Sequence, residues 1–367
     1  MPPDLAAALK RTSLPSLHGL RAIAVFLVVF YHFGIPRVNG GLGVLIFFVI
    51  SGFLITWLLL QEVERWGNVS LKLFYLRRTL RIFPAFYAYW LLLVVGVGVI
   101  LGKRVLWPQA WASFFYVNNY YQALFGDPNT GLSHTWSLAV EEQFYLLWPP
   151  AFILLARDQR RTVALEIVIL AVWIHRIYLS LFTGVDQGYI YEALDTRADH
   201  LLIGCLLAVL LYRGVWTRLW NALTAYSWSI WITIGALAVS SVTLSAPLYR
   251  DIAGFIIDPI LTAALIVQAL AFASSSARWM NWEAVAFLGR ISYSIYLYQQ
   301  IAMDPVKKLL AAYPFPIRLL AAITCVLIAA SFSYYVIEQP FLKLKDRWGK
   351  RLKAKPIELP ATTAPLS

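Results

Sequence analysis

Long apolar runs alternate with short polar segments along almost the whole sequence. A helix needs about 20 apolar residues to cross a bilayer, and ten runs are candidates for such helices. They cover residues 17–34, 41–61, 83–102, 134–156, 162–182, 198–212, 226–244, 252–273, 284–304 and 316–338. The pattern predicts an all-α, polytopic membrane protein with about ten transmembrane helices.

Positive charges predict the orientation of these helices. An even number of spans places both ends of the chain on one side. If that side is the cytoplasm, 20 Lys and Arg residues lie in inner segments and seven in outer segments, which agrees with the positive-inside rule. We therefore expect a cytoplasmic N-terminal segment (1–16), one membrane domain (17–340) and a basic, disordered cytoplasmic tail (341–367) without a further domain.

Composition narrows the class of partner. The chain is 60% hydrophobic and 14% charged, as expected for a membrane protein. Its net charge of +12 is carried by short loops and the C-terminal segment, so we expect contact with anionic membrane lipids and no nucleic-acid partner. Cys205 and Cys325 lie within apolar segments without metal-ligand spacing, so we expect neither a disulfide framework nor a metal site.

The first span carries two residues that lipid excludes, Arg21 and His32. Eleven residues of helix return the chain to within about 20° of the same face, about 16 Å further along the axis. One stripe therefore carries a fixed cation toward the inner side and a titratable imidazole toward the outer side. Ionisable residues in a span usually face the bundle interior and indicate function. The alternative is helix-end side chains that reach the lipid headgroups, which explains Arg21 better than His32.

A basic cluster precedes the third predicted span. Arg77, Arg78 and Arg81 occur within KLFYLRRTLRIFP, and Arg77 and Arg81 share a helix face. Arginine binds phosphate bidentately and stays charged, so the cluster fits a clamp for a phosphate-bearing soluble cofactor. An ordinary cluster of charges against lipid headgroups fits equally well.

The fourth predicted span begins with a second polar group. His134 and Glu141 lie within about 20° of one helix face, and Glu142 points about 80° away. An acidic residue is favourable near a helix N-terminus, which explains one glutamate but not the three residues together.

The sixth predicted span begins with Asp195, Arg197, Asp199 and His200. A polar binding site is one interpretation of this group. A structural salt bridge between Arg197 and either aspartate is an equal alternative.

Comparison of depths predicts a polar pocket that opens outward. Its expected members are His32, His134, Glu141, Asp195, Arg197, Asp199, Tyr296 and Gln299, and its inner rim carries Arg21, Arg77, Arg78, Arg81 and Glu338. An imidazole is well suited to take a proton from a hydroxyl near neutral pH. The arrangement fits transfer of a group from an inner, phosphate-bearing donor to an outer, hydroxyl-bearing acceptor. A proton-coupled transporter needs similar buried residues, so this pattern alone leaves both functions open.

A series of short motifs resembles one known family. The motifs that follow one another between residues 14 and 345 are LHGLRAIAVFLVVFYH, GVLIFFVISGFLIT, FYLRRTLRIFP, HTWSLAVEEQFYLLWP, DTRADHLLIGCLLA, GRISYSIYLY and YYVIEQPF. In this order they resemble acyltransferase family 3 of the membrane-bound O-acyltransferases. A single motif such as RRxxR is weak, but the ordered series is highly specific.

The resemblance implies a ten-helix enzyme of the bacterial inner membrane. Such an enzyme transfers an acetyl or other short acyl group from cytoplasmic acyl-CoA to a hydroxyl of a carbohydrate, such as a surface polysaccharide, or of a lipid-linked glycan. Acyl-CoA, with acetyl-CoA as the expected form, is then a co-substrate and not a permanently bound cofactor.

The same resemblance implies roles for particular residues. His32 matches the catalytic base of an Arg-x10-His motif, and Arg21 positions the donor or His32. Glu141 or Glu142 supports the site. Arg77, Arg78 and Arg81 match the motif that engages acyl-CoA. The residues expected to contact substrate are Ser51, His134, Trp136, Ser137, Asp195, Arg197 and Tyr296.

Two departures from the family pattern concern the acceptor. Leu45 stands where many members have Asp, and Tyr298-Gln299 stands where many have Trp-His. The subfamily, and with it the acceptor, therefore stays open. A transporter or flippase for a glycan or lipid-linked sugar is the competing function, and an inactive member that scaffolds glycan assembly is a third.

Overall fold

The structure is a computed structural model that describes residues 2–10, 14–243 and 246–353. Every regular element in this part of the chain is a helix, so the predicted all-α class is confirmed. In chain order the elements are α1 (Pro3–Leu9), α2 (Pro15–Phe33), α3 (Gly40–Trp66), α4 (Leu71–Leu91), η1 (Leu92–Ile100), α5 (Trp107–Phe114), α6 (Asn118–Phe125), η2 (Ser133–Thr135), α7 (Trp136–Leu154), α8 (Asp158–Tyr178), η3 (Leu179–Thr183), α9 (Gln187–Glu192), α10 (Leu194–Tyr212), α11 (Thr217–Leu223), α12 (Ser229–Thr243), α13 (Pro247–Tyr249), η4 (Arg250–Gly254), α14 (Phe255–Ala271), η5 (Arg278–Asn281), α15 (Glu283–Arg290), α16 (Ser292–Leu309), α17 (Phe315–Phe332), η6 (Ser333–Glu338) and α18 (Gln339–Lys353).

The predicted number of membrane-spanning helices can be compared with the helices of the described chain that are long and apolar enough to cross a membrane. Within the described residues, six helices are long and apolar enough to cross a membrane, and a seventh forms if α9–α10 and α11, which meet at 108°, count as one bent span. The predicted count of about ten is not confirmed. The predicted spans at 134–156 and 226–244 fall on α7 and α12, and the one at 284–304 falls on α15 and α16. Helix α12 has 15 residues, α7 carries two glutamates, and α16 carries three charged side chains.

Two element boundaries differ from the sequence-based expectation. The third span starts at Leu71 and not at residue 83, because the Ser70 hydroxyl caps α4 by accepting a hydrogen bond from the Leu73 amide at 3.4 Å. Arg77, Arg78 and Arg81 therefore lie within this helix and do not precede it. The tail expected to be disordered from residue 341 is helical as far as Lys353, and its remaining residues lie outside the described part.

Helix α3 forms the centre of the bundle. In its most apolar stretch 78% of the residues are buried, compared with 22% in α8. It packs closely along α10 because both helices present glycine at the contact. A Cβ atom at Gly52 would lie 1.9 Å from the Leu201 carbonyl oxygen, and one at Gly204 would lie 2.1 Å from that of Val49. We call this contact the glycine seam.

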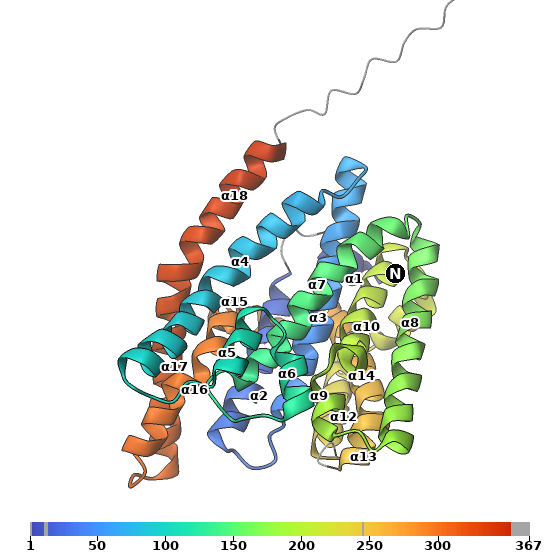
Figure 1. Cartoon of the computed structure of the whole chain (residues 1–367). Coiled ribbons are helices and arrows are strands. Elements are labelled where there is room, and N and C mark those ends of the chain that lie inside the picture. Colours follow the sequence, from blue (N-terminus) through green and yellow to red (C-terminus); the bar gives the residue numbers. More distant parts are fainter. Residues whose placement is uncertain (1, 11–13, 244–245, 354–367) are drawn as a thin grey trace, which may run out of the picture.

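The connections between helices gather at two ends of the bundle. In Figure 1 the α3–α4 and α7–α8 connections and the end of α18 lie at the top, which we call the upper end. The α2–α3 and α16–α17 connections lie at the bottom, which we call the lower end. Short helices α5 and α6 fill the long connection between η1 and α7, and expose the aromatic side chains of Trp107, Trp111, Phe115 and Phe125. If the upper end is cytoplasmic, as the charges predict, residues such as His32 at the end of α2 lie on the outer side.

Candidate active site

A cavity of about 540 Å³ lies among α2, α3, α4, α7 and α16. Its volume falls in the range of small-molecule binding sites. Side chains of α3 line it from Val44 to Trp66, which corresponds to about 33 Å along the helix axis at 1.5 Å per residue. The cavity therefore follows α3 from the upper end deep into the bundle.

Basic side chains dominate the lining of this cavity. They are Arg21, Arg65, Arg77, Arg78, Arg81 and Lys345, and the acidic ones are Glu62, Glu141 and Glu142. The fold thus brings together six residues that the sequence singles out on three different helices. Glu141 lies here, and not in an outward-facing pocket with His134, because the two turns of helix between them carry Glu141 about 10 Å deeper.

The upper part of the cavity is lined by the end of α3 and the start of α4. The Arg77 guanidinium forms an ion pair with the Glu62 carboxylate at 2.6 Å. Trp66 and Arg65 also line this part, and Trp66 is half exposed. A wide, charged entrance at the upper end follows from these positions.

The middle of the cavity is organised by Arg78. Its Nε lies 3.7 Å from the Glu142 carboxylate, and its Cζ lies 3.4 Å from the centre of the Tyr145 ring. The Tyr145 hydroxyl is hydrogen-bonded to that of Ser51, which joins α7 to α3. On α2, Arg21 lies with its Cζ 5.9 Å from the Phe47 ring, and its Nε has no hydrogen-bond partner among the described residues. Arg21 thus keeps donor capacity at the cavity.

The end of the cavity that lies deepest in the bundle, toward the lower end, is closed by Ser137 and Tyr296. Their hydroxyl oxygens lie 2.6 Å apart, and the Tyr296 hydroxyl also lies 2.9 Å from the His134 carbonyl oxygen, to which it can donate. The Phe47 ring packs edge-on against Tyr296 at 6.4 Å. This group of side chains separates the cavity from the polar residues at the lower end.

The two histidines predicted for the site lie beyond this closure. His134 packs its ring against Tyr296 at 5.4 Å, and its Nδ1 lies 3.1 Å from the Gln300 Oε1. His32 lies close enough to His134 and Gln299 to interact with both. Its Nδ1 lies 3.0 Å from the Val28 carbonyl oxygen, which accepts a hydrogen bond only from a protonated nitrogen. Nε2 is then the unprotonated nitrogen of the neutral ring.

The other predicted substrate contacts lie outside the cavity. Asp195 accepts hydrogen bonds from Tyr120 at 3.1 Å and from His175 at 2.9 Å. Burial and the neighbouring Asp195 carboxylate raise the pKa of Tyr120 to about 12, so its hydroxyl keeps the donated proton. Arg197 is fully buried and lies near Trp136, whose ring centre is 6.0 Å from its Cζ.

The salt bridge that the sequence allows between Arg197 and Asp195 or Asp199 does not form among the described residues. The reason is helix geometry, because residues two apart point to nearly opposite sides of a helix. Asp199 pairs with Arg176 on α8 instead, at 2.9 Å.

Comparison with known proteins identifies the family. The sequence profile of a family described as an acyltransferase domain matches residues 14–336. The chain belongs to this acyltransferase family. Members with similar sequences include the peptidoglycan O-acetyltransferase OatA of Listeria monocytogenes, which is 35% identical over 358 residues, 91% of this chain and 56% of OatA. The putative peptidoglycan O-acetyltransferase YrhL of Bacillus subtilis is 32% identical over 89% of this chain and 54% of its own length.

The family relatives are longer proteins. A putative O-acetyltransferase of Staphylococcus aureus is 33% identical over 91% of this chain, but over 58% of its own length. The chain therefore spans about half the length of the curated relatives that it matches. No solved structure matches the chain significantly.

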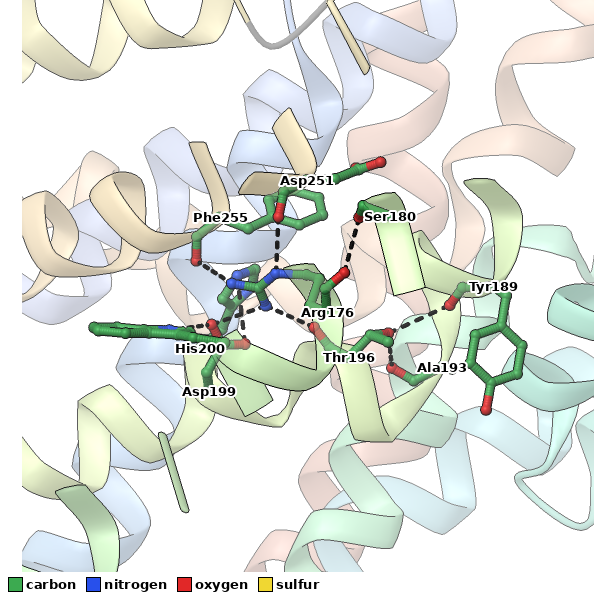
Figure 2. Close-up of polar contacts among 10 residues, drawn as sticks. Arg176, Ser180, Tyr189, Ala193, Thr196, Asp199, His200, Asp251 and Phe255 are labelled. Carbon is green, nitrogen blue, oxygen red and sulfur yellow. Dashed lines mark hydrogen bonds and ion pairs between the residues drawn. The ribbon is translucent and has the colours of Figure 1, made fainter. Parts of the chain in front are cut away.

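Sequence reasoning missed two features of this family member. Tyr145, the ring partner of Arg78, lies one helical turn after Glu141, and that spacing was the available signal. Arg176 was also missed, although an arginine within an apolar span is a signal by itself. Figure 2 shows its guanidinium enclosed by acceptors: it donates to the carbonyl oxygens of Asp251, Thr196 and Phe255 and to the Asp199 carboxylate, at 2.7 to 3.2 Å.

Proposed function

We propose that this protein is a membrane O-acyltransferase that transfers an acetyl or other short acyl group from acyl-CoA to a hydroxyl of a carbohydrate acceptor. The observation that carries the proposal is the arginine-lined cavity, which runs from the upper end of the bundle to the Ser137–Tyr296 closure. Membership of the acyltransferase family supports the reaction type.

The charges of the cavity suit the donor. Acyl-CoA carries several phosphate charges at one end and its thioester at the other. Arginine guanidinium groups bind phosphate bidentately, so the nucleotide end is held by Arg77 at the upper entrance and by Arg78 and Arg81, which follow it along α4. The pantetheine arm then extends along α3, and the thioester lies near Ser137 and Tyr296.

His32 acts as the general base. Its Nδ1 donates to the Val28 carbonyl oxygen, so Nε2 is free to take the proton of an acceptor hydroxyl. The hydroxyl oxygen then forms an ester bond to the acyl carbon, and the carbon–sulfur bond breaks. CoA leaves as the thiolate, and the proton held by His32 returns to it through water. Separation of Ser137 from Tyr296 admits the acyl group to the level of His32.

Arg21 and the two glutamates, Glu141 and Glu142, line the middle of this path. Glu142 and the Tyr145 ring hold Arg78 in place. Arg21, with an Nε that has no partner among the described residues, is available to polarise the thioester carbonyl as the acyl group passes.

The acceptor is a cell-surface glycan, and the protein acts in the bacterial inner membrane. The names of OatA and YrhL, which specify peptidoglycan, support a glycan of this kind. Acetyl-CoA binds from the cytoplasm, and the glycan binds on the opposite side.

The proposal is tested with purified protein in lipid nanodiscs, acetyl-CoA labelled on the acetyl group, and glycan fragments. Mass spectrometry is expected to find an added acetyl ester, and His32→Ala is expected to abolish it. Movement of an unmodified glycan across proteoliposomes, without label transfer, would instead identify a transporter.

A further inference from the structure

A second cationic site lies apart from the cavity, around Arg197 of α10. The Arg197 guanidinium is fully buried within a cage of aromatic rings. Its Cζ lies 4.0 Å from the centre of the Phe255 ring, 5.0 Å from that of Tyr191, and 6.0 Å from those of Phe48 and Trp136. Aromatic faces offset part of the cost of burying a cation, but they accept no strong hydrogen bond.

All three nitrogens of this guanidinium lack a hydrogen-bond partner among the described residues. The neighbouring carboxylates make ion pairs with other arginines, and the Oδ1 atom of Asp199 has no hydrogen-bond partner among the described residues. Asp199 pairs with Arg176 at 2.9 Å, and Asp251 pairs with Arg250 at 2.7 Å. A buried cation with unsatisfied donors is costly, so the site is complete only when it holds an acceptor.

Arg250 extends the site toward the surface. Its Nη2 also has no partner among the described residues, and its Cζ lies 5.5 Å from the Tyr191 ring, on which Arg197 also rests. Its side chain is 19% exposed, whereas that of Arg197 is completely buried. Arg250 begins η4 beside α13, which lies at the lower end in Figure 1. Arg197 and Arg250 therefore share the Tyr191 ring, and Arg250 is the one of the two that solvent reaches.

The site adjoins the end of the bundle that carries His32. The Trp136 and Tyr191 rings are in contact at 5.1 Å, and Trp136 directly precedes Ser137 of the cavity closure. The Tyr191 hydroxyl also lies close to Gly41 in the first turn of α3, because a Cβ atom added to this glycine would be 2.6 Å from it. A group held by Arg197 would thus lie beside the start of α3, next to the α2–α3 connection that follows His32.

The charges favour a monovalent occupant. Arg176 pairs with Asp199 and Arg250 pairs with Asp251, which leaves Arg197 as the one guanidinium of the three without a contacting carboxylate. A carboxylate neutralises this charge and matches the fork of a guanidinium, whereas a phosphate brings more negative charge than the group can balance. Glu192 lies within electrostatic range of Arg197, but no ion pair between them forms among the described residues.

We propose that Arg197 and Arg250 form a subsite for a carboxylate group of the acceptor. This inference rests on the proposed acyl transfer, because it assigns the subsite to the acceptor of that reaction. The subsite binds the carboxylate of the acceptor, and this carboxylate lies at a distance from the hydroxyl that His32 deprotonates. An acceptor that carries a carboxylate is therefore preferred over a neutral one.

Binding of two probes tests the subsite without turnover. The probes are N-acetylmuramic acid, which ends its lactyl group in a carboxylate, and its methyl ester, added to the full chain in nanodiscs and followed by calorimetry. We expect the acid to bind at least tenfold more tightly than the ester. Arg197→Gln and Arg250→Gln are each expected to remove this difference, and Arg37→Gln, which removes an exposed charge from the α2–α3 connection, is expected to keep it.

Folding of the variants is checked by size-exclusion chromatography. Arg197 makes no hydrogen bond to the described chain, so its replacement breaks none, and the more exposed Arg250 provides an independent variant. Equal binding of acid and ester, or tighter binding of N-acetylglucosamine 1-phosphate, would overturn the carboxylate subsite. An unchanged preference in both variants would mean that internal acidic groups such as Glu192 compensate Arg197.

Acetyl transfer to the same probes separates this inference from the proposed function. If the protein acetylates both probes with one KM, the acyl transfer stands and the subsite is refuted. If it binds the acid selectively but transfers no acetyl group to any glycan, the carboxylate site stands and the proposed function is refuted.

Discussion

At the scale of single residues, the ring of His32 has a defined tautomer. The Val28 carbonyl holds the proton on Nδ1 and leaves Nε2 as the basic nitrogen. We expect His32→Ala to lower kcat by about a hundred- to ten-thousand-fold, the usual contribution of a general base. The KM for acyl-CoA is expected to stay constant, because His32 lies outside the cavity. Steady-state kinetics with labelled acetyl-CoA measure both, and a variant that retains full kcat would contradict the role.

Arg78 lies in the part of the cavity where we propose that the donor binds, and it contacts Glu142 and Tyr145. A hydrogen bond to a charged group contributes about 1.5–3 kcal/mol, so Arg78→Gln is expected to raise the KM for acyl-CoA by roughly ten- to a hundredfold. The matched control is Arg160→Gln, an exposed arginine of α8 that does not line the cavity. If both variants gave the same KM as the unchanged protein, Arg78 would contribute only to the orientation of the helix in the membrane.

Residue types and spacing predicted the members of the cavity better than their arrangement. Arg21, Arg77, Arg78 and Arg81 were expected at one inner rim, and all four line the cavity. The contact of Arg78 with Tyr145 depends on how α4 packs against α7, and no periodicity within either helix specifies that.

At the scale of helices, Arg176 links α8 to α10, η4 and α14 through its four hydrogen bonds. Arg176→Gln is expected to lower the free energy of unfolding by about 3–5 kcal/mol, because it leaves Asp199 as a buried, uncompensated charge. Chemical denaturation in detergent measures this change.

The double variant Arg176→Gln/Asp199→Asn provides the control for this prediction. It removes both charges, so we expect it to be more stable than Arg176→Gln alone. If the stability losses of Arg176→Gln and Asp199→Asn add up to the loss in the double variant, the pair is not energetically coupled.

Helix α4 shows why element ends were harder to predict than elements. Its first half is rich in basic residues, which lipid excludes, so the sequence pattern placed the start of the membrane-spanning helix after them. They are helical because the Ser70 cap starts the helix early and the charged side chains face the cavity and its lining. The same reasoning explains α7, whose glutamates lower its apolar character although it lies inside the bundle.

At the scale of the whole molecule, the all-α class followed from apolar runs alone, but the number of spans did not. A hydropathy pattern does not distinguish a helix that contacts lipid from a short or polar one enclosed by its neighbours. Helices α7 and α16 carry charged side chains, and α12 is short, although Trp231, Ile232 and Val239 of α12 are more than half exposed.

Ligand binding by the whole molecule gives a prediction that does not depend on turnover. A ligand that binds only the folded state at one hundred times its Kd stabilises it by about 2.7 kcal/mol. Acetyl-CoA is therefore expected to raise the Tm in a thermal-shift measurement, and Arg78→Gln is expected to reduce the shift. Acetate serves as the control, and equal shifts with acetate and acetyl-CoA would contradict donor binding in the cavity.

The glycine seam between α3 and α10 limits how the molecule can open. The backbones approach so closely at Gly52 and Gly204 that a Cβ atom at either position would force the two helices apart. We therefore expect α3 and α10 to stay together, and we expect the proposed passage between the two sides to depend on movement of α7 and α16, which carry Ser137 and Tyr296. Spin labels placed across the seam are expected to keep one distance when acetyl-CoA is added, whereas labels on α7 and α16 are expected to report a change.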